Sequence, residues 1–154
     1  MSTVSISCCE DYDLVKVSFA VKRCLDLLGN VADLVKPGMK VLLKVNLLSA
    51  ALGPEYAVNT HPSVIRALVD IFQNDYGCEV YIGDSCGSLR TGSTYQAFRV
   101  TQIDRIARET GAIIVNFDKD ESLDIVNENG AILKSFKIAK TVKSVDVVVS
   151  VPKL

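Results

Sequence analysis

The sequence predicts an α/β fold, with a layered, mostly parallel sheet and helices on both faces, and three observations predict it. Apolar runs alternate with amphipathic segments along the chain. Several of these runs are apolar on both faces, which is typical of interior strands in parallel sheets. The 154 residues are 49% hydrophobic and 23% charged, which suits one sizeable core. We therefore expect a single α/β domain over residues 1–154.

The first two elements follow from their periodicity. Val4, Ile6 and Cys8 alternate with serines, the period-two pattern of a half-buried strand. Apolar residues then recur at helical spacing over 13–28. Asp13 can cap the start of that helix, and the glycine at position 29 can end it. We expect a strand over 4–8 followed by this helix.

The middle of the chain repeats one alternation. Apolar runs over 41–43, 80–82 and 113–115 predict buried strands. Amphipathic helices are predicted over 62–76 and 101–110. Strands separated by helices in this way pair in parallel through right-handed crossovers.

The pattern changes in the last third of the chain. Residues 122–138 alternate on either side of Asn129-Gly130, which predicts a β-hairpin appendage. A short turn or helix over 139–144 leads into a final buried strand over 145–149. Because only a few residues follow that apolar strand, we expect the chain to be the amino-terminal part of a longer protein.

Composition and charge exclude several classes of protein. The 17 basic and 18 acidic residues are interspersed, and Trp is absent, so we expect no nucleic-acid partner. No apolar run is long enough to cross a bilayer, so we expect no membrane association and a cytoplasmic location. The chain has one histidine and five cysteines without a C-x-x-C pair. We therefore expect reduced thiols and no metal site.

Polar residues follow the predicted strands at the points where ligands gather in α/β sheets. The candidate ligand-binding residues at these strand ends are Lys44, Asn46, Ser85 and Lys153. Their clustering on one edge predicts a site for a small anionic molecule.

Lys44 is the most informative of these residues, because it follows three large apolar residues. Its ammonium group must reach water, a carboxylate or a ligand anion. A structural pair with Asp84 or Asp118 and a role in substrate binding both remain open. Asp84 is also a candidate for proton transfer.

Thr60-His61-Pro62 places the only histidine at the start of a helix. Free backbone amides and the helix dipole favour an anion at such a point. His61 is therefore a candidate for proton transfer, and Thr60 is a candidate ligand-binding residue. The alternative for His61 is a packed or surface side chain.

Two connections frame this edge. Residues 47–59 lack periodicity and are longer than an ordinary loop between strand and helix, which is typical of lids and binding segments. The second connection, 85–93, is rich in small residues, and its Arg90 is a candidate anion contact. Its glycine spacing resembles a P-loop, but Ser93 stands where that motif needs lysine, so we do not infer a nucleotide triphosphatase. Cys86 is the thiol we expect to be most accessible.

The same residues carry a resemblance to a known family. Five short motifs occur in order: Lys44-Val45-Asn46-Leu47, Thr60-His61-Pro62, Gly83-Asp84-Ser85, Val115-Asn116-Phe117-Asp118 and Val151-Pro152-Lys153-Leu154. This ordered set resembles domain of unknown function 362, although Val45 stands where the family usually has proline. Members usually continue with a Lys-Thr-His stretch and a further α/β portion, and many carry ferredoxin-like cysteine motifs. None of these cysteine motifs occurs here, so the resemblance implies a redox-associated setting for some relatives and no cofactor on these residues. An iron–sulfur cluster would belong to a carboxyl-terminal region.

Two functions are compatible with these observations. The first is an anion-binding domain belonging to an iron–sulfur-associated redox enzyme, in which His61 and Asp84 exchange protons. The alternative is a non-catalytic interaction or scaffold domain, in which the same residues only cap strands and pair charges. Exposed apolar surface would then favour a homodimer. A concave pocket where Lys44, His61 and Asp84 converge would favour the first.

Overall fold

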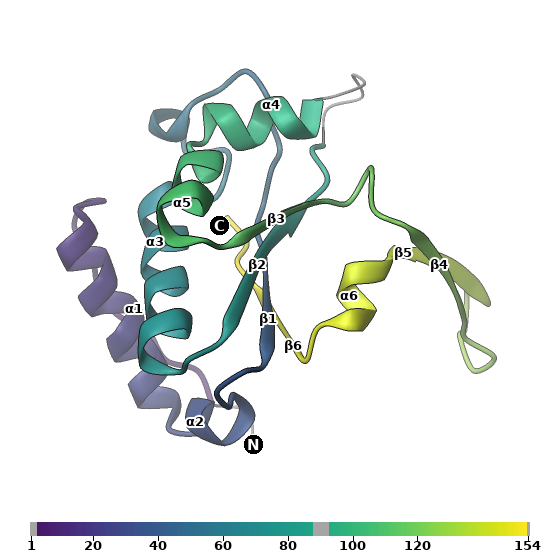
Figure 1. The fold of residues 1–154 in the computed structure, drawn as a ribbon, viewed down its shortest axis with the longest axis horizontal. Helices are drawn as coiled ribbons and strands as arrows, with labels where there is room; N and C mark the ends of the chain where they lie inside the picture. The colour runs from purple at the N-terminus through teal and green to yellow at the C-terminus, as the bar shows by residue number, and fades with distance from the viewer. Residues whose placement is uncertain (1–2, 88–92, 154) are drawn as a thin grey trace.

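A four-stranded parallel sheet forms the centre of the protein (Figure 1). The computed structural model describes residues 3–87 and 93–153. The strand order is β3-β2-β1-β6, and all three pairings are parallel. The carboxyl ends of the four strands therefore meet at one edge, as predicted. The strands are β1 (Lys40–Lys44), β2 (Glu79–Asp84), β3 (Ile113–Asn116) and β6 (Val147–Ser150).

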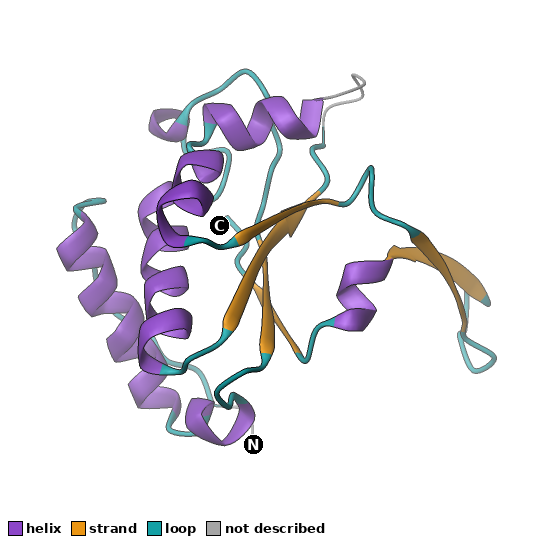
Figure 2. Ribbon diagram, in the orientation of Figure 1, coloured by secondary structure: helices purple, strands orange, loops and turns teal. Residues whose placement is uncertain are grey.

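Helices flank the sheet unequally. Three helices, α1 (Leu14–Leu28), α3 (Pro62–Asp70) and α5 (Ile103–Thr110), lie on one side (Figure 2). On the other side lie the short α6 (Lys140–Ser144) and the predicted hairpin, formed by β4 (Ser122–Val126) and β5 (Ser135–Ala139). The remaining elements are α2 (Val31–Leu34), the 3-10 turn η1 (Pro54–Tyr56), the π-helical turn η2 (Ile71–Asp75) and α4 (Ser93–Val100).

The ends of α1 form as the sequence predicts. The Asp13 Oδ1 atom accepts hydrogen bonds from the backbone N–H groups of Val15, at 3.1 Å, and Lys16, at 3.2 Å. These contacts satisfy amides that have no partner inside the helix. At the other end Gly29 adopts a left-handed conformation with φ 74°, which ends the helix.

The core lies between the sheet and these three helices, and Ala97 and Phe98 of α4 also belong to it. Val41, Leu42 and Leu43 of β1 are fully buried, in agreement with the predicted interior strand. On the face opposite the core, the ring of Phe117 packs directly on Gly83. A Cβ atom at Gly83 would lie 2.5 Å from Phe117 Cε1, so this position accepts only glycine without rearrangement.

The predicted strand over 4–8 is wrong. The segment pairs with no strand in the described part of the chain, and Val4 and Ile6 are 80% and 85% exposed. Its inward side carries serines instead, and the Ser5 hydroxyl donates to the Cys24 carbonyl at 2.8 Å. The alternating pattern favours a strand only where another backbone offers hydrogen bonds, and here a side chain attaches the segment to α1.

The strands predicted as buried at 113–115 and 145–149 lie at the two edges of the sheet. Ile113 is 39% exposed and Val148 is 46% exposed. The helix predicted over 101–110 begins instead at Ile103, because Gln102 adopts a left-handed conformation with φ 61° and separates it from α4. No helix was predicted over the residues of α4.

Candidate functional site

The carboxyl ends of β1 and β2 lie side by side and are joined by an ion pair. Lys44 is paired with Gly83 in the sheet, and its Nζ atom lies 2.8 Å from Asp84 Oδ1. The other carboxylate considered for Lys44, Asp118, accepts a hydrogen bond from the Thr94 hydroxyl at 2.5 Å. Asp84 is therefore the partner of Lys44.

Both oxygens of the Asp84 carboxylate are engaged. While Oδ1 faces Lys44, Oδ2 accepts the backbone N–H of Leu47 at 2.7 Å. The Asp84 side chain is 6% exposed and that of Lys44 is 43% exposed. A buried carboxylate needs such partners to offset its lost hydration. The pair therefore fixes the start of the 47–59 connection.

Thr60 joins this connection to the end of β6. Its hydroxyl accepts the Asn46 N–H at 2.8 Å and donates to the Val151 carbonyl at 2.7 Å. The Asn46 side chain donates to the Val58 carbonyl at 3.0 Å. Thr60 and Asn46 therefore lie at the predicted edge, but the hydrogen bonds of their side chains are with the backbone of the protein itself.

Asn59 organises the same connection and was missed by the sequence analysis. Its Oδ1 atom accepts the N–H groups of Leu48 and Ser49, at 2.8 and 3.0 Å. Its Nδ2 atom donates to the carbonyls of Ser49 and Leu52. The only signal in the sequence was an asparagine in a long aperiodic segment, where such side chains commonly bond the local backbone.

His61 is placed at the start of α3, as predicted, and its ring is held on two sides. Its Nδ1 atom accepts the backbone N–H of Ser63 at 3.2 Å, which leaves the proton of the neutral ring on Nε2. The ring stacks on Tyr12, with centroids 3.6 Å apart and an angle of 14° between the planes. Burial, and then the positive charge of Lys153, lower the pKa of His61 below its ordinary value.

Lys153 lies beside the same aromatic ring. Its Nζ atom donates to the Tyr12 hydroxyl at 3.0 Å and lies 5.8 Å from the ring centroid. Within residues 3–87 and 93–153, no carboxylate lies within 4 Å of Lys153 Nζ. Lys153 is thus a partly buried cation whose described neighbours do not neutralise it. Tyr12, which precedes α1, was not a predicted site residue.

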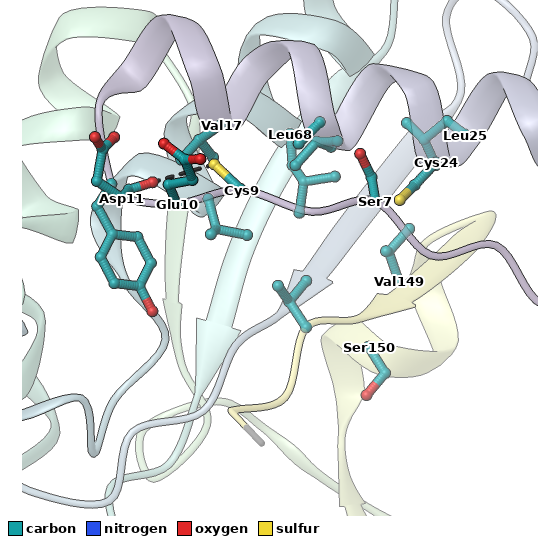
Figure 3. A pocket seen from close by; sticks show the side chains of 15 residues that line it. Ser7, Cys9, Glu10, Asp11, Val17, Cys24, Leu25, Leu68, Val149 and Ser150 are labelled. Atoms are coloured by element: carbon teal, nitrogen blue, oxygen red, sulfur yellow. Dashed lines mark hydrogen bonds between the residues drawn. The ribbon is translucent and has the colours of Figure 1, made fainter.

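A pocket of about 570 Å³ adjoins Tyr12 (Figure 3). It lies between the 7–12 segment, α1, α3 and the end of β6, and most of its lining side chains are apolar. Its apolar lining comes from Val17, Ala20, Val21, Leu25, Val64, Leu68, Val149 and Val151. Lys44 and Asp84 do not line this pocket. The predicted residues therefore form two groups, Lys44 with Asp84 and His61 with Lys153.

The connection after β2 differs from its prediction. Ser85 is exposed directly after the strand, whereas Arg90 lies outside the described residues. Cys86, predicted to be the most accessible thiol, is buried at 9% exposure. Its backbone N–H donates to the Thr94 hydroxyl at 2.8 Å, and its thiol lies 3.8 Å from the Leu48 carbonyl. The unexpected helix α4 carries Thr94 and encloses this cysteine.

The described residues offer no ligand set for a metal or an iron–sulfur cluster. No three metal-binding side chains group together among them. The cysteines are dispersed, with Cys8 and Cys9 exposed before α1 and Cys78 and Cys86 buried elsewhere. In the same part of the chain, no helix has the length and apolarity needed to cross a membrane.

A family model described as "Domain of unknown function (DUF362)" matches residues 41–154. The chain belongs to this family. It is also 32% identical over 85 residues to the thylakoid-associated protein sll1697 of Synechocystis sp. (strain ATCC 27184 / PCC 6803 / Kazusa). That stretch is 55% of this chain and 26% of the relative, so the similarity spans about a quarter of the relative's length. No solved structure matches the chain.

The DUF362 match has a boundary that matters for the site. It begins at Val41 and includes every site residue predicted from the sequence. Tyr12 lies before it, as does α1, which lines the pocket. This DUF362 protein therefore builds the surroundings of Lys153 partly from residues outside the range that the family model matches.

Proposed function

We propose that this DUF362 protein binds a small anionic ligand at the carboxyl ends of its parallel strands, with Lys153 as the main cation. The observation that carries the proposal is the position of Lys153. It follows β6 at the edge where ligands commonly bind in α/β sheets, it contacts Tyr12, and within the described residues no carboxylate neutralises it. An anion would supply the missing counter-charge.

The surroundings of Lys153 support an anion. The neutral His61 ring keeps Nε2–H as a donor because Nδ1 is already an acceptor. The Tyr12 oxygen accepts from Lys153, which leaves its own O–H free to donate. His61 also caps α3, whose amino-terminal end carries a partial positive charge. We propose His61 as the residue for proton transfer and Tyr12 as a ligand contact.

Lys44 and Asp84 have a different role in this proposal. Both oxygens of Asp84 are engaged, so we propose that it acts as a positioning residue through Lys44 and Leu47 rather than by transferring protons. Asn46 and Thr60 position the edge in the same way, and the exposed Ser85 remains a proposed ligand contact.

The rival function is a non-catalytic interaction or scaffold domain. It is favoured by the mutual pairing of Lys44 and Asp84. It is also favoured by exposed apolar side chains on the 3–9 segment, α1 and β6, namely Val4, Ile6, Phe19 and Val148. Exposed apolar side chains of this kind would favour a homodimer, which light scattering measures directly.

The wider setting of the domain is also part of the proposal. We propose a cytoplasmic location and, for a longer protein containing this domain, a role in an iron–sulfur-associated redox enzyme. The cluster would be held by residues other than these, because the described cysteines do not converge. No step of the proposed binding involves it.

Calorimetric titration with sodium acetate and inorganic phosphate tests the proposal. We expect Lys153→Met to weaken anion binding about tenfold or more, because the main cation is lost. Lys143→Met, which changes an exposed lysine near the end of α6, is the matched control and should bind like the wild type. Equal affinities for the wild type and Lys153→Met would contradict the proposal.

A further inference from the structure

The ammonium group of Lys153 and the apolar pocket share a wall. Tyr12 contacts Lys153 through its hydroxyl and also lines the pocket. Val151, two residues before Lys153, lines the same pocket and is 7% exposed. A ligand held at Lys153 can therefore extend along Tyr12 and Val151 into the apolar space.

The pocket has the dimensions and the lining of a ligand site. Its volume of about 570 Å³ falls within the range of pockets that enclose small molecules. Val17 and Leu68 come from two helices, and Val149 comes from the sheet edge opposite them (Figure 3). Walls contributed by three elements would bury an alkyl chain on several sides.

The charges at the end of the pocket next to Tyr12 are partly neutralised. Glu10 and Asp11 lie together at one end, while Cys24 and Leu25 lie at the other (Figure 3). The Asp11 carboxylate is paired with Lys16 Nζ at 2.7 Å. Glu10 is exposed to solvent, where water screens its charge. Lys153 does not line the pocket itself, but it contacts the Tyr12 hydroxyl at this end and has no carboxylate partner among the described residues.

From this geometry we infer that the ligand is an amphipathic carboxylate, with its head on Lys153 and Tyr12 and its alkyl tail in the pocket. The inference rests on the proposed function, because it assigns the class of anion to the same cation. Recognition would combine one charge-assisted contact with burial of the chain, and each methylene that enters the pocket should tighten binding about fourfold.

A homologous series of ligands tests the inference. Straight-chain carboxylates from acetate to octanoate are titrated into the whole protein by calorimetry, with n-alkylamines of equal length as the charge control. We expect affinity to rise about fourfold per carbon for the carboxylates until the pocket is filled. The amines should bind more weakly at every length, because Lys153 repels them.

Two variants of α1 locate the alkyl chain. Val21→Phe places a ring in the pocket and should remove the dependence on chain length while acetate binding persists. Leu27→Phe is the matched control, because Leu27 is 56% exposed and does not line the pocket. Wild-type affinity for octanoate in Val21→Phe would overturn the inference.

The outcomes separate this inference from the proposed function. Acetate binding that depends on Lys153 but does not increase with chain length would overturn the inference and leave the proposed function intact. Amines that bind as tightly as carboxylates would overturn the assignment of the head group. Failure of every carboxylate and of phosphate to bind would overturn both.

Discussion

Lys44 and Lys153 both lie near the carboxyl ends of neighbouring parallel strands, Lys44 as the last residue of β1 and Lys153 three residues after β6, but their surroundings are opposite. Lys44 meets the buried Asp84, which also binds the Leu47 amide. Lys153 meets the Tyr12 hydroxyl, with no described carboxylate within 4 Å. The comparison teaches that the neighbours of a lysine at a strand end decide its role. A lysine with a buried carboxylate partner stabilises the fold, and one without such a partner can bind an anion.

The neighbours differ because the two strands differ in position. β1 is interior, so the next strand supplies Asp84 beside Lys44. β6 is at an edge, so one side of its carboxyl end is bordered by the 7–12 segment and α1 instead. The carboxyl end of β1 is therefore closed by an ion pair, whereas that of β6 lies next to a pocket.

The largest expected effect on stability comes from removing the Asp84 carboxylate, which pairs with Lys44 at the carboxyl end of β1. We expect Asp84→Ala to lower the free energy of unfolding by about 3 kcal/mol, because it leaves Lys44 unpaired and the Leu47 N–H without its acceptor. Urea unfolding followed by circular dichroism measures the change.

The control for Asp84 is an exposed ion pair of similar length. Asp124 pairs with Lys137 at 3.0 Å, and both side chains are mostly exposed. Asp124→Ala should therefore change the free energy of unfolding by less than about 0.5 kcal/mol. Similar losses of unfolding free energy in the two variants would refute the view that the pair of Lys44 and Asp84 stabilises the fold.

A smaller loss of stability is expected when the Thr60 hydroxyl, which links the chain after β1 to the chain after β6, is removed. Thr60→Val keeps the shape of the side chain but removes the acceptor for the Asn46 N–H and the donor to the Val151 carbonyl. We expect a loss of about 2 kcal/mol in the free energy of unfolding. Thr3→Val, on the exposed amino-terminal segment, is the control, and an unchanged stability of Thr60→Val would show that the link is dispensable.

The smallest expected effect is a pH dependence of stability that comes from His61, near the carboxyl end of β6. The folded pKa of His61 lies below its value in the unfolded chain, so the unfolded state takes up a proton first as the pH falls. This contribution to stability is fully present above about pH 6.5 and is lost as the pH falls through the unfolded value towards the lower folded one.

Thermal unfolding at pH 7 and pH 5 measures that effect. His61→Asn retains an acceptor for the Ser63 N–H but does not titrate in this range, so its melting temperature should fall less than that of the wild type. An equal fall in both proteins would mean that His61 does not contribute to the pH dependence.

Local patterns in the sequence predicted the fold well. Asp13 and Gly29 bound α1 as expected, and Asn129-Gly130 lies between the strands of the hairpin. The parallel arrangement of the central strands and the proximity of Lys44 to Asp84 also followed from the pattern. These features depend on residues close in sequence or on the general topology of α/β sheets.

The errors concern partners that are distant in sequence. The 4–8 segment has a strand pattern, but no local feature reveals whether a second backbone will pair with it. Tyr12 was missed because its contacts, His61 and Lys153, lie far along the chain. The break between α4 and α5 was invisible because Gln102 is not a glycine yet adopts a left-handed conformation.

The contact between Gly83 and Phe117 has a consequence for comparing relatives. Each residue belongs to one of the short motifs that mark the family, yet the two are tied together by steric fit. A relative with alanine at the position of Gly83 should carry a smaller side chain at the position of Phe117. Joint substitution at these two positions would therefore signal a compensating repacking of the sheet, without implying a new ligand.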